Sequence, residues 1–207
     1  MSVGETRNPD SALKSALAGG LRLPRKLLSM GPAGAWDWFA RNARRVLWGV
    51  PDLARCRVTE QLFVGEQFSR RGWGALQAAG VTVVVNLREE FDDLSLGIDI
   101  PTYCHLPTTD WQPPTIDDLR KGVRVISEAV ARGEKVYVHC MVGMGRAPTM
   151  AAAYLVTTGM TPDAAMARIR AVRPFIEPNA AQMARLHEFA AAYRREQGAE
   201  NDADVLQ

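Results

Sequence analysis

A cysteine and an arginine six residues apart form the strongest chemical signal in this sequence. Cys140 ends the run KVYVHC, Arg146 begins the run RAPTM, and the residues between them are Met141, Val142, Gly143, Met144 and Gly145. Two glycines allow such a loop to turn sharply with its backbone amides pointing inward. Inward amides at the start of a helix bind anions. Arginine can hold two oxygens of one phosphate group through paired hydrogen bonds.

This arrangement predicts a cysteine nucleophile aimed at phosphorus. The loop amides and Arg146 stabilise the thiolate form of Cys140, and its attack would give a phosphocysteine that water then hydrolyses. We therefore predict that Cys140 and Arg146 are catalytic and that residues 141–146 bind the phosphate. A buried structural cysteine is the alternative. The His139 that directly precedes Cys140 and the strand–loop–helix pattern favour catalysis.

A carboxylic acid that protonates the leaving oxygen accelerates the cleavage of a phosphate ester. Asp110 lies thirty residues before Cys140, in the segment HLPTTDWQPP between a predicted strand and a predicted helix. Asp117 and Asp118 are the competing carboxylates. They fall in the first turn of the predicted helix, where acidic side chains stabilise the helix end. We therefore predict Asp110 as the general acid, and a role in capping a turn is the alternative.

The hydrophobic pattern predicts strands that alternate with helices from about residue 55 onward. The run VTVVVNL has the continuous β-branched character of a strand that is buried on both faces. Strands are predicted over residues 61–66, 81–87, 102–107 and 135–140, and helices over 71–79, 115–133, 147–158, 161–172 and 179–196. This order predicts an α/β fold with a central, mostly parallel sheet that is flanked by helices.

The loop around Cys140 resembles that of the dual-specificity branch of the protein-tyrosine-phosphatase superfamily. The matching residues are His139, Cys140, Gly143, Gly145 and Arg146. The resemblance continues in RPFIEPNAAQMARLHEF (173–189) and spans about residues 55–192. It implies the dual-specificity phosphatase fold, a covalent intermediate, and catalysis without a metal or another cofactor. It also implies that Arg173 supports the phosphate loop or the substrate.

The sequence departs from the family pattern directly after Arg146. Family members carry Ser or Thr there, whose hydroxyl helps the thiolate to leave, whereas this chain has Ala147. Ala147 predicts slower turnover and, in the extreme case, a phosphate-binding pseudophosphatase. Plant glucan phosphatases have a similar Gly-x-Gly-Arg-Ala-Pro segment, so an alanine at this position is compatible with an active enzyme.

Several longer segments resemble the mitochondrial PTP-like phosphatidylglycerophosphate phosphatases. The segments are RVT…LFVG, NLREEFDD, LPTTDWQPPTIDDLRKGV and GRAPTMAAAYL. This resemblance implies a glycerophospholipid headgroup as substrate. However, the loop is apolar at Met141, Val142 and Met144, whereas the loop of that family is basic. A protein tyrosine or serine phosphatase and a glucan phosphatase therefore remain alternatives. The glucan alternative also draws on the five tryptophans, Trp36, Trp38, Trp48, Trp73 and Trp111.

The charge of the chain is unevenly distributed. Residues 1–50 contain eight Lys and Arg against three Asp and Glu, although the whole chain has a formal net charge of +2. We predict a basic N-terminal arm over residues 1–45 that is partly disordered or helical, a phosphatase domain over 46–197, and a flexible tail over 198–207. Such an arm suits peripheral contact with a membrane surface. We expect no nucleic-acid partner.

The cysteines indicate the compartment. Cys56, Cys104 and Cys140 have neither paired spacing nor metal-ligand spacing, which favours a reducing environment. Cys104 and Cys140 would form a protective disulfide under oxidation if their strands were neighbours. No apolar run is long enough to span a membrane. We predict a bacterial protein, on the abundance of Ala and Arg, located in the cytoplasm or peripherally at the inner membrane surface.

Overall fold

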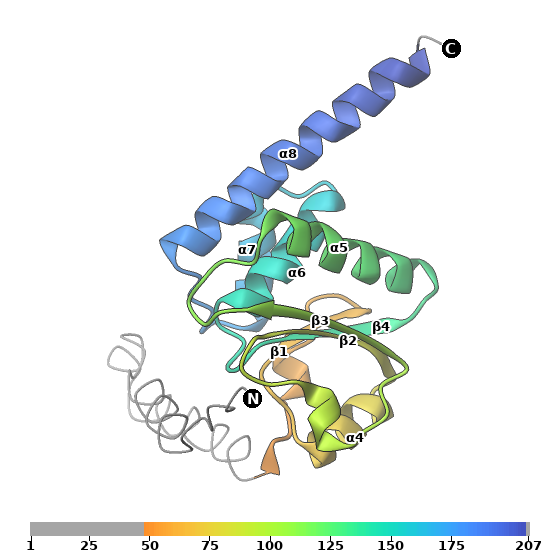
Figure 1. Cartoon of the computed structure of the whole chain (residues 1–207), viewed down its shortest axis with the longest axis vertical. Helices are drawn as coiled ribbons and strands as arrows, with labels where there is room; N and C mark the ends of the chain where they lie inside the picture. The colour runs from red at the N-terminus through yellow and green to blue at the C-terminus, as the bar shows by residue number, and fades with distance from the viewer. Residues whose placement is uncertain (1–47, 206–207) are drawn as a thin grey trace, which may run out of the picture. The chain divides into compact units, whose positions relative to one another are not determined.

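The computed structural model describes residues 48–205, and the side chains of residues 48–198 (Figure 1). These residues belong to Asn42–Gln207, the larger of the two units into which the chain divides. The basic arm that we predict over residues 1–45 lies outside the described residues. Among the helices of the described part, none is long and apolar enough to cross a membrane.

A sheet of four parallel strands forms the centre of the domain, as the sequence predicts. The strands are β1 (Leu62–Gly65), β2 (Val81–Arg88), β3 (Thr102–Thr108) and β4 (Lys135–His139). Their order across the sheet is β1-β4-β2-β3, and all three pairings are parallel. Every residue of β1 and all but one of β2 are buried. These apolar strands therefore suit a position between two layers of helices.

Helices cover both faces of the sheet (Figure 1). On one face, α4 (Arg70–Ala78) packs against β2 and β4 through Trp73 and Leu76. The other face is covered by α5 (Ile116–Ala131), α6 (Arg146–Thr157), α7 (Pro162–Val172) and α8 (Ala180–Val205). Alternate strand residues face opposite layers, as the geometry of a strand requires. Helix α6 is buried along nearly its whole length, so its first residue is anchored in the core.

Threonine side chains cap the starts of two helices. Thr115 precedes α5, and its Oγ1 accepts a hydrogen bond from the Asp118 amide at 3.0 Å. Thr161 caps α7 in the same way, with the Ala164 amide at 3.2 Å. Each such cap stabilises its helix by about 1 kcal/mol. Two short 3-10 helices, η1 (Leu53–Arg55) and η2 (Asp93–Leu96), lie in the connections.

The last helix is longer than the sequence pattern predicts. Helix α8 continues to Val205, so the boundary predicted for a flexible tail at residue 198 falls inside a helix. Gly198 costs this helix only about 1 kcal/mol relative to alanine. The segment from 196 to 205 has no proline, and its Glu, Gln and Ala residues have high helix propensity. One glycine is too weak a signal to end the helix.

The carboxyl ends of the four strands meet at one edge of the sheet. Strand β4 leads into Cys140, β2 into Glu89 and Glu90, β3 into Asp110, and β1 into Glu66. In open α/β sheets, ligands bind at this edge. The parallel arrangement therefore collects residues that are far apart in the sequence and that can act on one ligand.

The packing of α5 gives a prediction about stability. Ile126 is fully buried in the larger hydrophobic cluster, whereas Glu128 on the same helix is exposed. Ile126→Ala should lower the free energy of unfolding by about 2–5 kcal/mol, because it removes buried methylene groups and leaves a cavity. Urea unfolding measures this change. Glu128→Ala is the matched control and should change the value by less than about 0.5 kcal/mol; an equal loss in both variants would contradict the described packing.

Candidate active site

The phosphate loop, residues 140–146, turns sharply between β4 and α6. Gly143 has a left-handed φ of 69°, and a Cβ there would lie 2.5 Å from the carbonyl oxygen of Gly65. A Cβ on Gly145 would lie 2.6 Å from Oε1 of Gln182. Gly143 therefore requires glycine, because its backbone is left-handed and a larger residue would meet the backbone of Gly65, whereas a side chain at Gly145 would displace the end of Gln182.

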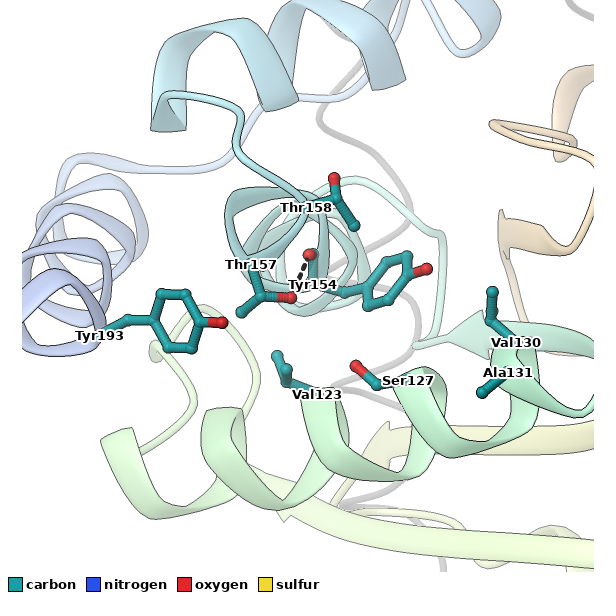
Figure 2. Close-up of a pocket in the computed structure, with 8 residues that line it drawn as sticks. All are labelled: Val123, Ser127, Val130, Ala131, Tyr154, Thr157, Thr158 and Tyr193. Carbon is teal, nitrogen blue, oxygen red and sulfur yellow. Dashed lines mark hydrogen bonds between the residues drawn. The ribbon is translucent and has the colours of Figure 1, made fainter. Parts of the chain in front are cut away.

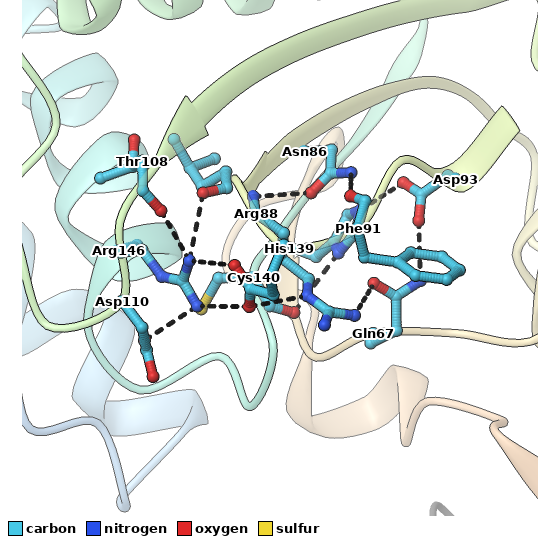
Figure 3. A network of polar contacts seen from close by, with 12 residues as sticks. Gln67, Asn86, Arg88, Phe91, Asp93, Thr108, Asp110, His139, Cys140 and Arg146 are labelled. Carbon is cyan, nitrogen blue, oxygen red and sulfur yellow. Dashed lines mark hydrogen bonds and ion pairs between the residues drawn. The ribbon is translucent and has the colours of Figure 1, made fainter. Parts of the chain in front are cut away.

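Arg146 is only 1% exposed, so its charge depends on nearby acceptors. Its Nη1 donates to the carbonyl oxygen of Thr108 at 2.7 Å and to Oε2 of Glu90 at 3.0 Å (Figure 3). Its Nη2 lies 3.1 Å from Oε1 of Glu90 and 2.8 Å from Oδ1 of Asp110. The Nε is buried and has no hydrogen-bond partner among the described residues. The Nη1 and Nη2 groups of the guanidinium are thus paired, whereas the N–H of Nε has no acceptor among the described residues.

The charges around Arg146 reinforce one another. Burial alone would lower the pKa of the Arg146 guanidinium, but hydrogen bonding to Glu90 and the charges of Cys140, Glu90 and Asp110 together raise it. Burial alone would raise the pKa of the Glu90 carboxyl group. The hydrogen bonds that it accepts from Arg146 and Arg88 outweigh this effect and lower its pKa to about 2. Both partners therefore stay charged at neutral pH. Cys140 is 2% exposed and lies close enough to Arg146 for its charge to contribute to the raised pKa of the guanidinium.

A chain of polar contacts connects the end of β4 with Glu90 (Figure 3). Nε2 of His139 lies 2.7 Å from Oδ2 of Asp93, and both side chains are fully buried. Gln67 donates to the other oxygen of Asp93 at 2.7 Å. Arg88 donates to Gln67 at 2.8 Å and to Glu90 at 2.9 Å. Such a network fixes its members together, because each buried polar group depends on the next for its partner.

Asp110 lies in a short loop after β3 that has a strained backbone. Its side chain is 61% exposed and reaches Arg146 at 2.8 Å. The next residue, Trp111, has a φ of 63° and is also 61% exposed. Left-handed backbone at a bulky residue is costly and is typical of functional sites. Thr109 ties this loop to the end of β2 through a hydrogen bond of 2.8 Å to Glu89.

Arg173 contacts the backbone of the phosphate loop. Its Nη2 lies 2.7 Å from Glu66 and 3.4 Å from the carbonyl oxygen of Val142. Its Nη1 lies 3.3 Å from Sγ of Cys56. Burial raises the pKa of the Cys56 thiol to about 12, so Cys56 is a packed thiol at neutral pH. Arg173 therefore connects the phosphate loop with Glu66, the residue that follows β1. This contact agrees with the supporting role that the sequence resemblance implies.

The proposed disulfide between Cys104 and Cys140 does not fit the strand order. Cys104 pairs with Val85 on β2, and Val85 pairs with Val138 on β4. The two cysteine-bearing strands are therefore separated by β2, at least about 9.6 Å apart at the usual strand spacing. A disulfide requires Cα atoms within about 7 Å. All three cysteines are free. The condition for a protective disulfide, that the two strands be neighbours, is not met.

A shallow groove of about 430 Å³ lies between α5, α6 and α8, away from the phosphate loop (Figure 2). Its uncharged lining consists of Val123, Ser127, Val130, Ala131, Tyr154, Thr157, Thr158 and Tyr193. Thr157 ends α6, whereas Arg146 begins it, so the two ends are about 16 Å apart. The hydroxyl of Thr157 is engaged with the carbonyl oxygen of Tyr154 at 2.7 Å. The groove therefore contributes nothing to the charged site.

The structure places Asp110 against Arg146, and Arg146 beside Cys140, at the carboxyl edge of the sheet. Glu90, Asp93 and Gln67 also belong to this polar network, although they were not among the site residues predicted from the sequence. All three lie in segments that follow β1 or β2. Polar residues directly after buried parallel strands are a usable signal for a ligand site. That signal would have identified Glu90, while Asp93 and Gln67 depend on loop packing.

Comparison with known proteins decides the family. The family model described as "Dual specificity phosphatase, catalytic domain" matches residues 62–192. The chain belongs to the dual-specificity phosphatase family. The resemblance inferred from the sequence is thereby confirmed, and so is the assignment as a phosphoric monoester hydrolase that acts on phosphorylated substrates.

Relatives of this phosphatase include lipid phosphatases. Human phosphatidylglycerophosphatase and protein-tyrosine phosphatase 1 is 30% identical over 165 residues, which is 74% of this chain and 73% of the human protein. Phosphatidylglycerophosphate phosphatase PTPMT1 of Arabidopsis thaliana is 32% identical over 139 residues, which is 64% of this chain and 41% of that protein.

Solved structures confirm the predicted fold class. The structure of PTPMT1 in complex with PI(5)P superposes with a TM-score of 0.63 at 26% identity, over 68% of this chain and 97% of that one. A variant of human DUSP28 superposes with a TM-score of 0.60 at 25% identity, over 68% and 97% of the two chains. The dual-specificity phosphatase therefore has the sheet and helical layers of its family.

The Arg146–Glu90 pair predicts a specific pH dependence of stability. Because the pKa of Glu90 is lowered from 4.5 to about 2 in the folded protein, the pair stabilises the fold above pH 4.5, and this contribution is lost as the pH falls toward 2. The Glu90 side chain is 39% exposed, and solvent screening reduces the effect. Glu90→Gln should therefore lower the free energy of unfolding at pH 7 by about 1–2 kcal/mol.

Urea unfolding at pH 7, 5 and 3 tests this prediction. The difference between the wild type and Glu90→Gln should shrink at the lowest pH, where Glu90 begins to be protonated. Glu60→Gln is the matched control, because Glu60 is 90% exposed beside Arg57 and should give a small, nearly constant difference. A Glu90→Gln difference that is the same at all three pH values would contradict the pairing.

Proposed function

We propose that this phosphatase cleaves phosphate monoesters through a phosphocysteine at Cys140, with Arg146 as phosphate clamp and Asp110 as general acid. The observation that carries the proposal is Nε of Arg146, which is buried without a partner in the described part of the chain. An unpaired buried donor costs about 1–3 kcal/mol. A phosphate oxygen would satisfy this donor, and the amides of residues 141–146 would hold the remaining oxygens.

The substrate and Asp110 compete for the same side of Arg146. Asp110 contacts Nη2 at 2.8 Å, next to the unpaired Nε. A phosphate that binds Nε and Nη2 in the bidentate manner must displace the Asp110 carboxylate. The displaced carboxyl group then faces the bound phosphate. It is then suited to carry the proton that the leaving oxygen needs.

Two balanced steps follow. First, the thiolate Sγ of Cys140 attacks phosphorus, the bond from phosphorus to the ester oxygen breaks, and Asp110 gives its proton to that oxygen. Then water attacks the phosphocysteine, its proton passes to the Asp110 carboxylate, and the S–P bond breaks to restore the thiolate and release phosphate. The loop amides and Arg146 stabilise the phosphoryl oxygens in both steps.

We favour a phospholipid headgroup as the substrate, with phosphatidylglycerophosphate as the leading example. Trp111, Met141 and Val142 are exposed apolar side chains directly after Asp110 and Cys140. Exposed aromatic and apolar side chains beside a site suit a membrane-bound substrate. Arg146 is the one cation of the phosphate loop, and Glu90 and Asp110 already balance it. This balance argues against polyphosphorylated inositol lipids, whose additional phosphomonoester groups need additional cations.

Two further considerations support a lipid substrate. The Arabidopsis relative is a phosphatidylglycerophosphate phosphatase by name, and the name of the human relative joins phosphatidylglycerophosphatase with protein-tyrosine phosphatase. The sequence over residues 1–45 is basic, and basic segments are attracted to anionic lipid surfaces. The proposal therefore includes peripheral contact with a membrane from the cytoplasmic side.

Phosphate release from a panel of substrates tests this function. Purified full-length protein is incubated with phosphatidylglycerophosphate in vesicles, a phosphotyrosine peptide and phosphorylated amylopectin. We expect release to be fastest from the lipid. Cys140→Ser should lower release from every substrate by more than about a thousandfold, because the nucleophile is lost.

The outcomes separate the chemistry from the substrate. Faster release from the peptide or the glucan would contradict the lipid assignment and leave the phosphocysteine mechanism in place. Equal release by the wild type and Cys140→Ser would contradict the mechanism itself.

Ala147 predicts that breakdown of the phosphocysteine is slow. Ala147 is fully buried, and the next hydroxyl in α6, that of Thr149, is engaged with the carbonyl oxygen of Gly145 at 2.9 Å. Ala147→Ser should raise the steady-state rate about fivefold, which corresponds to one hydrogen bond of about 1 kcal/mol to the departing thiolate. Rapid-quench kinetics should show a burst in the wild type that is reduced in Ala147→Ser.

A matched control tests whether the position of the new hydroxyl matters, or only the presence of a hydroxyl in α6. Ala152→Ser places a hydroxyl at another fully buried position of α6 and should not raise the steady-state rate. A wild-type burst without any later turnover would instead identify a pseudophosphatase. Linear product formation from the start, with no effect of Ala147→Ser, would contradict slow breakdown.

A further inference from the structure

Three side chains at the start of α8 hold the segment that follows Asp110. Each donates a hydrogen bond to a backbone carbonyl oxygen of that segment. The donor–acceptor pairs are Asn179 with Trp111 at 2.7 Å, Gln182 with Gln112 at 3.2 Å and Arg185 with Pro114 at 2.9 Å. The donors are three residues apart and therefore lie on one face of the helix. We call Asn179, Gln182 and Arg185 the α8 clamp.

The start of α8 fixes the orientation of two clamp side chains. The Asn179 amide N–H donates to Oε1 of Gln182 at 3.0 Å, and the Gln182 amide N–H donates to Oδ1 of Asn179 at 2.9 Å. These reciprocal bonds form a capping box. Because the cap uses both side-chain oxygens, both NH₂ groups are left to donate to the loop carbonyls.

Gln182 also borders the phosphate loop. It is 2% exposed, and its Oε1 lies where a Cβ on Gly145 would meet it at 2.6 Å. The same side chain therefore touches the phosphate loop and the loop that carries Asp110. The backbone of Trp111, with a φ of 63°, costs about 1–3 kcal/mol. The bonds of the α8 clamp offset this cost and hold the turn in place.

We propose that Asn179 is a positioning residue that keeps Asp110 over the phosphate loop while the substrate is bound. This inference rests on the proposed function. Asp110 contacts Arg146 at 2.8 Å, and a bound phosphate must take that position. Once the contact is broken, the Asp110 loop needs a different anchor to keep the carboxyl group near the leaving oxygen. Asn179 supplies one at Trp111, the residue next to the acid.

The substitution Asn179→Ser isolates this role. Serine retains an oxygen that can cap the helix but removes the Nδ2 donor. The test compares kcat/KM for phenyl phosphate and p-nitrophenyl phosphate, which have a similar shape. Phenolate is the poorer leaving group and needs the proton of Asp110, whereas p-nitrophenolate leaves with little help. We expect a loss of roughly tenfold to a hundredfold with phenyl phosphate and less than about threefold with p-nitrophenyl phosphate.

Two further variants make the test independent of stability. Asn179→Asp retains the capping oxygen and turns a second oxygen toward the carbonyl of Trp111, so it should give at least the same selective loss. Thr161→Ala weakens the cap of α7, away from Asp110, and should leave the ratio of the two activities unchanged. The basic limb of the pH profile with phenyl phosphate should flatten in Asn179→Ser, as in Asp110→Asn.

The outcomes decide between positioning and simple structural support. An equal loss with both substrates, or no loss with either, would overturn the positioning role while the wild-type enzyme remains active. Absence of turnover by the wild type would overturn the proposed function, and the positioning role with it.

Discussion

The buried guanidinium of Arg146 is the constraint on which the rest of the described structure depends. A buried cation without partners costs several kcal/mol, so acceptors must surround it. These come from separate parts of the sheet, Thr108 at the end of β3, Glu90 after β2 and Asp110 beyond β3. Pairing one side chain therefore fixes the ends of two strands, β2 and β3, relative to α6. The same side chain begins the central helix, so the core and the site are built around one residue.

This constraint also separates the roles of the two carboxylates. Glu90 receives hydrogen bonds from both Arg88 and Arg146, and it is less exposed than Asp110. Asp110 makes its contact from a strained loop whose side chains face solvent. When a dianion approaches, repulsion acts on both carboxylates, and the one with fewer bonds and more water moves first. Glu90 can thus keep Arg146 oriented while the Asp110 carboxylate is displaced.

The parts of the structure that the sequence predicts are those set by local chemistry. The β-branched run of β2 and the threonine caps of α5 and α7 depend on residues close in sequence, and so does the turn at Gly143 and Gly145. The sheet order does not, and for that reason the sequence could not decide whether the strands of Cys104 and Cys140 are neighbours. The roles of Asp93 and Gln67 could not be predicted, because their partners in this network lie 21 to 46 residues away and are brought close only by packing. Local patterns carry no information about such pairs.

In the phosphate loop, the groups suited to bind phosphate are different from the side chains that can set substrate preference. Its chemistry relies on backbone amides, two glycines and the buried Arg146, whereas Met141 and Val142 are exposed. A loop side chain that points to solvent can change from basic to apolar without disturbing the backbone amides of the phosphate loop. The Asp110 loop follows the same principle, since the clamp binds carbonyl oxygens and leaves the Trp111 side chain exposed. Substrate preference can therefore vary among relatives that share the same sheet, cation and nucleophile, because the variable atoms are not those that hold the phosphate.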